Sequence, residues 1–169
     1  MGCSRSQITL LMILGLSACG PVAMPSGPPG GVGSAEIACP APARTARDAP
    51  ALVALMNAER ARAGLQPLTL SAPVSAVAQA HACDAAARQD IGHIGRDGST
   101  LSERLQRGGI TAALVAENNA SFYRTPAEAM AAWMASPPHR ANILRPAVRR
   151  VGVGQADGAA AVWVVDFTS

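Results

Sequence analysis

Three polar side chains in this sequence have the types needed for chemistry. They are His93, in a glycine-rich stretch, Glu117, and His139, which follows two prolines. Two neutral imidazoles and one carboxylate suit Zn²⁺ and leave one ligand position open for water. The same groups could act without metal as an acid–base pair, because histidine titrates near neutral pH. They are far apart in the sequence, so only a fold could bring them together.

Each of these residues also has a structural interpretation. His93 and His139 could simply hydrogen-bond the backbone and fix loops. Ser136 lies three residues before His139, which could activate its hydroxyl as a nucleophile, although two prolines intervene. His81 lies on an apolar helical stripe, which favours a core histidine. A basic cluster after His139 indicates a solvated face or a contact with anionic lipid or cell-wall polymers; it comprises Arg140, Arg145, Arg149 and Arg150.

Composition narrows the classes of function. The 169 residues include 49% hydrophobic and 15% charged residues with a net charge of +3, which argues against disorder and against nucleic-acid binding. All basic residues are arginine, so a catalytic lysine and a P-loop lysine are excluded. No phosphate-cradling glycine loop or haem-attachment motif is visible. We expect a monomer that requires no cofactor, with Zn²⁺ as the one candidate.

The N-terminus reads as a targeting segment. The apolar run Ile8–Leu16 is shorter than the roughly 20 residues that span a bilayer, and it suits a signal peptide over residues 1–18. The sequence Leu16–Cys19 resembles a bacterial lipoprotein signal, which implies a lipid-modified Cys19 and a membrane anchor. An ordinary secretory signal with an incidental cysteine is the alternative. Gly20 in place of aspartate favours the outer membrane of the cell envelope.

The residues after Cys19 divide into a linker and a domain. Residues 19–38 are rich in proline, glycine and serine, which predicts a linker, and residues 39–169 are the predicted folded domain. Cys39 and Cys83 are the cysteines left in this domain. In an oxidising compartment we expect a disulfide between them, with two free buried thiols as the alternative.

Helices are predicted from apolar periodicity and from capping residues. The expected helices cover residues 50–63 and 73–89, a short stretch from Thr100 and a stretch from Thr125. Asp48 would cap the first helix, whose apolar side would carry Leu52, Val53, Leu55 and Met56. The Pro137-Pro138 pair would end the last helix.

The C-terminal third has the pattern of short strands. Two valine-rich runs, at residues 148–155 and 161–167, are separated by Asp157-Gly158, which is typical of a β-hairpin. A further strand is expected at Leu114-Val115. Helices around a small antiparallel sheet predict an α+β layered domain.

From about Ala51 to Phe167 the sequence resembles the CAP superfamily, which contains cysteine-rich secretory proteins, antigen 5 and pathogenesis-related proteins. The blocks that carry the resemblance run in order through the domain: Leu55–Asn57, Arg60, Gly64 and Leu68; His93 with Asp97-Gly98; Glu117-Asn118; Trp133–Pro137, His139-Arg140, Asn142–Leu144 and Gly152–Gly154; Trp163 and Phe167. The resemblance implies a three-layer α-β-α sandwich with a shallow cleft.

The resemblance also assigns residues to that cleft. It implies that His93, Glu117 and His139 line it, and that Asn118, Ser136 and Asn142 support it. The eukaryotic branch has a second glutamate where this chain has Ser136, which weakens any mechanism that needs two carboxylates.

We therefore expect an envelope-anchored lipoprotein whose CAP domain binds a metal ion, a lipid or a cell-wall component without catalysis. A metal-assisted hydrolase of protein or cell wall, using the same three residues, is the alternative. A pure interaction module with a merely structural cleft is the third.

Overall fold

The computed structural model describes residues 39–169, so the predicted signal peptide, Cys19 and the linker lie outside the described residues. The elements in chain order are α1 (Thr45–Arg62), β1 (Thr69–Leu70), α2 (Ala72–Arg88), α3 (Leu101–Arg107), β2 (Val115–Ser121), α4 (Pro126–Ala135), α5 (Pro137–Ile143), β3 (Arg150–Ala156) and β4 (Val162–Thr168). Among these residues no helix is both long and apolar enough to cross a bilayer.

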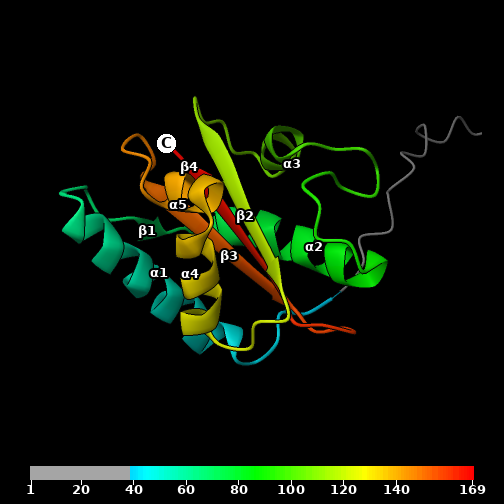
Figure 1. The fold of residues 1–169 in the computed structure, drawn as a ribbon. Helices are drawn as coiled ribbons and strands as arrows, with labels where there is room; N and C mark the ends of the chain where they lie inside the picture. Colours follow the sequence, from blue (N-terminus) through cyan, green and yellow to red (C-terminus); the bar gives the residue numbers. More distant parts are fainter. Residues whose placement is uncertain (1–38) are drawn as a thin grey trace, which may run out of the picture. The chain divides into compact units, whose positions relative to one another are not determined.

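The four strands form one sheet between two layers of helices (Figure 1). Their order is β1-β3-β4-β2, and β4 pairs antiparallel with both β3 and β2. Helices α1, α4 and α5 pack with one face of the sheet and α2 with the other, beside α3. The predicted three-layer α-β-α sandwich is confirmed. The two-residue strand β1 was not expected, and it adds a parallel pair with β3.

The central strand β4 is buried along its whole length. Trp163, Val165 and Phe167 face the core beneath α1 and α4, whereas Val162 and Val164 pack against α2. Helices cover both faces, which explains a valine-rich run instead of an alternating one. The predicted hairpin is confirmed, because β3 and β4 pair over their full length around a loop at residues 157–161.

Two helix starts follow the predicted capping boxes. The Thr100 and Thr125 side chains accept hydrogen bonds from the backbone N–H groups of Glu103 and Glu128, and each glutamate reaches back to the cap. The prediction for Pro137 was incomplete. It ends α4, but it also begins α5, because proline is well tolerated in the first turn of a helix.

The predicted start of the first helix was wrong. Helix α1 begins at Thr45, so Asp48 lies inside it instead of capping it. The Asp48 side chain is buried and is paired with Arg47 at 2.8 Å. Leu55 was expected on the apolar side of this helix, but it is 37% exposed and lies outside the core. The side chain that the sequence indicated as a helix cap therefore forms a buried ion pair inside the helix.

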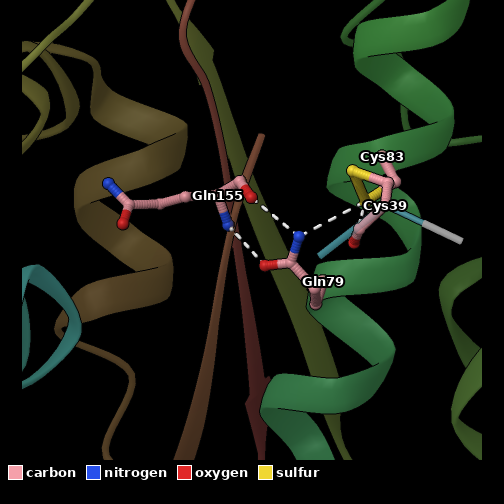
Figure 2. The surroundings of a disulfide bond; sticks show 4 residues. All are labelled: Cys39, Gln79, Cys83 and Gln155. Carbon is pink, nitrogen blue, oxygen red and sulfur yellow. Dashed lines mark hydrogen bonds between the residues drawn. A yellow bond between two sulfur atoms is a disulfide. The ribbon is translucent and has the colours of Figure 1, made fainter. Parts of the chain in front are cut away.

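The disulfide between Cys39 and Cys83 is confirmed, with Cα atoms 5.8 Å apart (Figure 2). Beside it, the Gln79 side-chain amide donates to the Gln155 carbonyl at 2.7 Å and accepts from the Gln155 N–H at 3.0 Å. This pair of bonds ties α2 to the backbone of β3. The cross-link closes a loop with a sequence separation of 44, which in the chain-entropy account is worth about 4 kcal/mol.

Helix α2 lies unusually close to β3. A Cβ atom added at Gly152 would lie 2.3 Å from the Val74 carbonyl carbon, and one at Gly154 would lie 2.3 Å from the Ala78 carbonyl oxygen. Both neighbours are backbone atoms that cannot move aside without shifting the helix. The two glycines therefore set the distance between these layers.

We predict that Gly154→Ala destabilises the domain by roughly 1–3 kcal/mol or more, because the added methyl group overpacks the contact between α2 and β3. The measurement is urea unfolding followed by circular dichroism. Gly158→Ala in the hairpin loop is the matched control, because its Cβ would meet nothing closer than 3.5 Å. Equal stabilities for the two variants would contradict the close approach.

Candidate functional site

The carboxylate of Glu117, on the edge strand β2, is the centre of the site. Its side chain is 3% exposed, and both of its oxygens have partners. Arg104 Nη2 donates to Oε2 at 2.5 Å, and His93 Nδ1 lies 2.7 Å from Oε1. Asn119 Nδ2 also donates to Oε1, at 3.2 Å. The buried negative charge is thus held by a guanidinium, an imidazole and an amide.

Arg104 reaches Glu117 from α3, whose start is fixed by its capping box. The same guanidinium donates through Nη1 to the carbonyls of His93, at 2.9 Å, and Ser99, at 3.0 Å. His93 lies within the loop between α2 and α3, and Ser99 lies near its end. Arg104 therefore holds this loop in place, so that the His93 side chain, 58% exposed, is positioned at the surface.

His81, on α2, lies close to Glu117 on the buried side of the site. Its Nε2 lies 3.0 Å from the Gly92 carbonyl and 3.8 Å from Glu117 Oε1, while Nδ1 is buried with no hydrogen-bond partner in the described chain. Burial lowers the pKa of His81 and Arg104 lowers it further, although Glu117 opposes both. The predicted core location of His81 is confirmed.

Asp166 adds a second carboxyl group beside Glu117. The two residues are paired across β4 and β2 in the sheet register. Asp166 is completely buried, and neither of its carboxyl oxygens has a hydrogen-bond partner within residues 39–169. Burial, and then repulsion by Glu117, raise the pKa of Asp166 well above its usual value. The environment therefore favours a neutral acid at this position.

His139 approaches the site from the opposite layer, on α5. Asn118 Nδ2 donates to the His139 carbonyl at 3.0 Å, and Asn142 Nδ2 donates to Asn118 Oδ1 at 2.9 Å. Burial lowers the pKa of His139, and the positive charge of nearby His93 lowers it further. Glu117 and Asn118 are neighbours on a strand, so they face opposite layers. The site thus extends around the edge strand β2.

Side-chain donors cap carbonyls of β2. Trp133 Nε1 donates to the Asn119 carbonyl at 3.2 Å, and Asn142 Nδ2 donates to the Glu117 carbonyl at 3.3 Å. These bonds occupy acceptors that an edge strand would otherwise leave open. Ser136 lies at the junction of α4 and α5, and in the described chain no hydrogen bond joins its hydroxyl to His139. This geometry gives no support to a serine nucleophile.

The arrangement does not present a zinc site as it stands. Within residues 39–169, no three His, Cys, Asp or Glu side chains are placed to hold a metal ion. Glu117 has both oxygens engaged by Arg104, His93 and Asn119. Zinc binding by His93, Glu117 and His139 stays a prediction, and it requires Glu117 to change partners.

Sequence reasoning did not find Arg104, Asn119 or Asp166. Two of them carry a recognisable pattern. Arg104 lies three residues after Leu101 on the inward stripe of α3, and Asp166 interrupts a valine-rich strand. A charge at a position where the periodicity demands an apolar side chain implies a buried partner.

Residues 53–167 match the family model described as the cysteine-rich secretory protein family, CAP. The chain belongs to this family. It is 33% identical over 116 residues to the uncharacterized protein YkwD of Bacillus subtilis, a match that covers 69% of this chain and 45% of that protein. The CAP chain thus spans less than half of that relative's length.

Solved structures agree with this membership. An extracellular protein containing an SCP domain from Bacillus anthracis is 28% identical with a TM-score of 0.66, over 70% of this chain and 39% of that one. An outer surface protein of Borrelia burgdorferi is 21% identical with a TM-score of 0.69, over 74% of this chain and 94% of that one, which shows the shared fold alone.

We predict that Arg104→Met destabilises the CAP domain by roughly 3–5 kcal/mol, because it leaves the Glu117 carboxylate buried without its cation. Arg107→Met is the matched control on the same helix: Arg107 is 57% exposed and pairs with Asp97 at the surface. The control should cost no more than about 1 kcal/mol. Urea unfolding at neutral pH measures the free energy of unfolding of both variants. A similar loss of stability in the two would contradict the importance of the ion pair between Arg104 and Glu117.

We predict that stability falls with pH below the ordinary histidine pKa of 6.5, because His81 and His139 resist protonation only in the folded state. The unfolded chain then binds more protons, so acid favours unfolding. His81→Gln should reduce the loss of unfolding free energy between about pH 7.5 and 5.5. Asp166 acts in the opposite direction, but it is present in both proteins. An unchanged pH slope in the variant would contradict this assignment.

Proposed function

We propose that this protein is an exported, lipid-anchored CAP domain that binds a ligand at the exposed His93 beside Glu117 without turning it over. The observation that carries the proposal is the full engagement of Glu117 by Arg104 and His93. A general base needs a carboxylate that can take up a proton from substrate. Both Glu117 oxygens already accept hydrogen bonds from Arg104, His93 and Asn119, so Glu117 suits positioning of His93 better than proton transfer.

The surroundings of His93 indicate the chemistry of the ligand. The imidazole uses Nδ1 toward Glu117, and within the described residues Nε2 has no hydrogen-bond partner. Two large apolar side chains lie close to it in the loop: Ile91 is 39% exposed and Ile94 is 51% exposed. A loop that exposes an imidazole and two isoleucines suits a ligand with both polar and apolar parts. Of the three expected ligand classes, a cell-wall component or a lipid headgroup fits this better than a bare metal ion.

The anchoring rests on the sequence. The run that resembles a lipoprotein signal ends at Cys19, and the cysteine pair forms a disulfide, as expected for an exported domain. Two similar solved proteins are named as extracellular and as outer surface proteins. These observations support a place in the bacterial cell envelope, and Gly20 favours the outer membrane within it.

A metal-assisted hydrolase is the second candidate. Its support is that burial, and then His93, lower the pKa of His139, which favours the neutral imidazole that a metal requires at that residue. In that case His93, Glu117 and His139 would hold Zn²⁺, which would supply an activated water. This function requires Glu117 to leave Arg104.

Sedimentation with insoluble cell wall, and separately with lipid vesicles, tests the proposal. We expect His93→Gln to weaken binding to one of these by tenfold or more, because the variant loses the imidazole that Glu117 positions at the surface. Arg96→Gln is the control in the same loop, since Arg96 pairs with Asp84 at the surface. Wild type should release no soluble fragments.

Zinc calorimetry on the same proteins separates the alternatives. Micromolar binding that is lost in both His93→Ala and His139→Ala, together with release of fragments that a chelator stops, would establish the hydrolase and overturn the binding module. If the two variants are less stable but bind cell wall, lipid and zinc as wild type does, the two histidines have a structural role. That result would also overturn the binding module.

A further inference from the structure

Phe122 combines an unfavourable backbone conformation with an exposed aromatic side chain. It follows β2 with a φ of +73°, and its side chain is 79% exposed, the largest exposure among the large apolar side chains of residues 39–169. Left-handed backbone is unfavourable for a bulky side chain and is easily adopted by glycine. Solvent exposure means that packing within the domain does not offset this strain. Features of this kind concentrate at functional positions.

Phe122 lies at the end of the domain where the chain comes in from its N-terminus. The Phe122 N–H donates to the Ala161 carbonyl at 2.9 Å, which places it beside the loop of the β3–β4 hairpin. Arg44 pairs with Asp157 of that loop at 2.5 Å, and Cys39 packs in the cluster beside Ala156. Figure 1 shows the start of α1, the hairpin loop and the turn after β2 at this end of the sheet.

The distance from this end to the proposed anchor is limited. Residues 20–38 separate Cys19 from Cys39 and span at most about 65 Å when fully extended. A lipid on Cys19 would therefore keep this end of the domain within that distance of the bilayer. The inference below rests on that part of the proposed function.

We propose that Phe122 contacts the interface between lipid headgroups and acyl chains, and so orients the CAP domain on its membrane. An exposed aromatic ring gains from leaving water at that depth. Arg124 is exposed and lies close enough to Asp157 to lower the pKa of that carboxyl, so it belongs to the same end. Its guanidinium can reach phosphate headgroups while the ring enters the interface. His93, beside Glu117 in the middle of β2, then stays accessible from outside the bilayer.

Depth-dependent fluorescence on the full lipoprotein tests this contact. Phe122→Trp places a probe at the site, and Trp133 and Trp163 give a constant background because each is only 1% exposed. Thr111→Trp is the matched control: it is exposed and precedes β2, so it lies at the opposite end of that strand from Phe122. The proteins are reconstituted in phosphatidylethanolamine–phosphatidylglycerol vesicles with or without brominated acyl chains.

We expect the added emission of the Phe122→Trp protein to shift to the blue and to lose at least half its intensity with brominated lipid, while that of Thr111→Trp does not change. Equal quenching at both positions, or none at Phe122→Trp, would overturn the contact. In a second variant, Phe122→Gly should melt at the same or a higher temperature than wild type, because glycine relieves the positive φ. A clearly lower melting temperature would show that the ring packs within the domain and would also overturn the proposal.

Mass spectrometry of the intact protein separates this inference from the anchor itself. Lipid on Cys19 with no quenching of Phe122→Trp would remove the Phe122 contact and leave the anchor standing. Quenching without lipid on Cys19 would remove the anchor and leave Phe122 as an independent membrane contact.

Discussion

The ion pair between Glu117 and Arg104 is the interaction on which the site depends. Removing a carboxylate from water costs several kcal/mol unless a partner of opposite charge goes with it. Arg104 supplies that charge from α3, and it also binds the carbonyls of His93 and Ser99. The position of α3, the path of the loop and the orientation of His93 therefore follow from one buried charge.

The second constraint is the open edge of β2. An edge strand leaves backbone acceptors unpaired, and here Trp133 and Asn142 donate to them from the helical layer. The Glu117 side chain contacts Arg104 of α3, whereas the neighbouring Asn118 side chain contacts His139 and Asn142 of α5 on the opposite face. A ligand at this edge can meet groups from both layers, which a site on a covered sheet face would not allow.

Local patterns in the sequence predicted what depends on local physics. The capping boxes at Thr100 and Thr125 and the hairpin are confirmed. The pairing of Cys39 with Cys83 is also confirmed, but it joins residues 44 apart and followed from the two cysteines left in an exported domain. The failures have two different causes. Strand β1 has two residues and exists only because it pairs with β3, which is distant in the sequence. Asp48 pairs with the nearby Arg44 and Arg47 and is buried inside α1, so a local cap pattern misplaced the start of that helix. The meeting of Arg104 with Glu117 required the packing of α3 against β2, which no spacing in the sequence specifies.

Charge balance connects the site to its function. Burial favours the neutral forms of Asp166 and His81, so the interior cluster contains one negative charge, on Glu117, and one positive charge, on Arg104. A zinc ion would compete with the guanidinium of Arg104 and with His93 for the same Glu117 oxygens. A neutral or amphipathic ligand that hydrogen-bonds His93 disturbs none of these charges. Asp166 lies on β4 and is completely buried, so it does not stand where the eukaryotic branch has its second glutamate, a position that Ser136 fills between α4 and α5 in this chain.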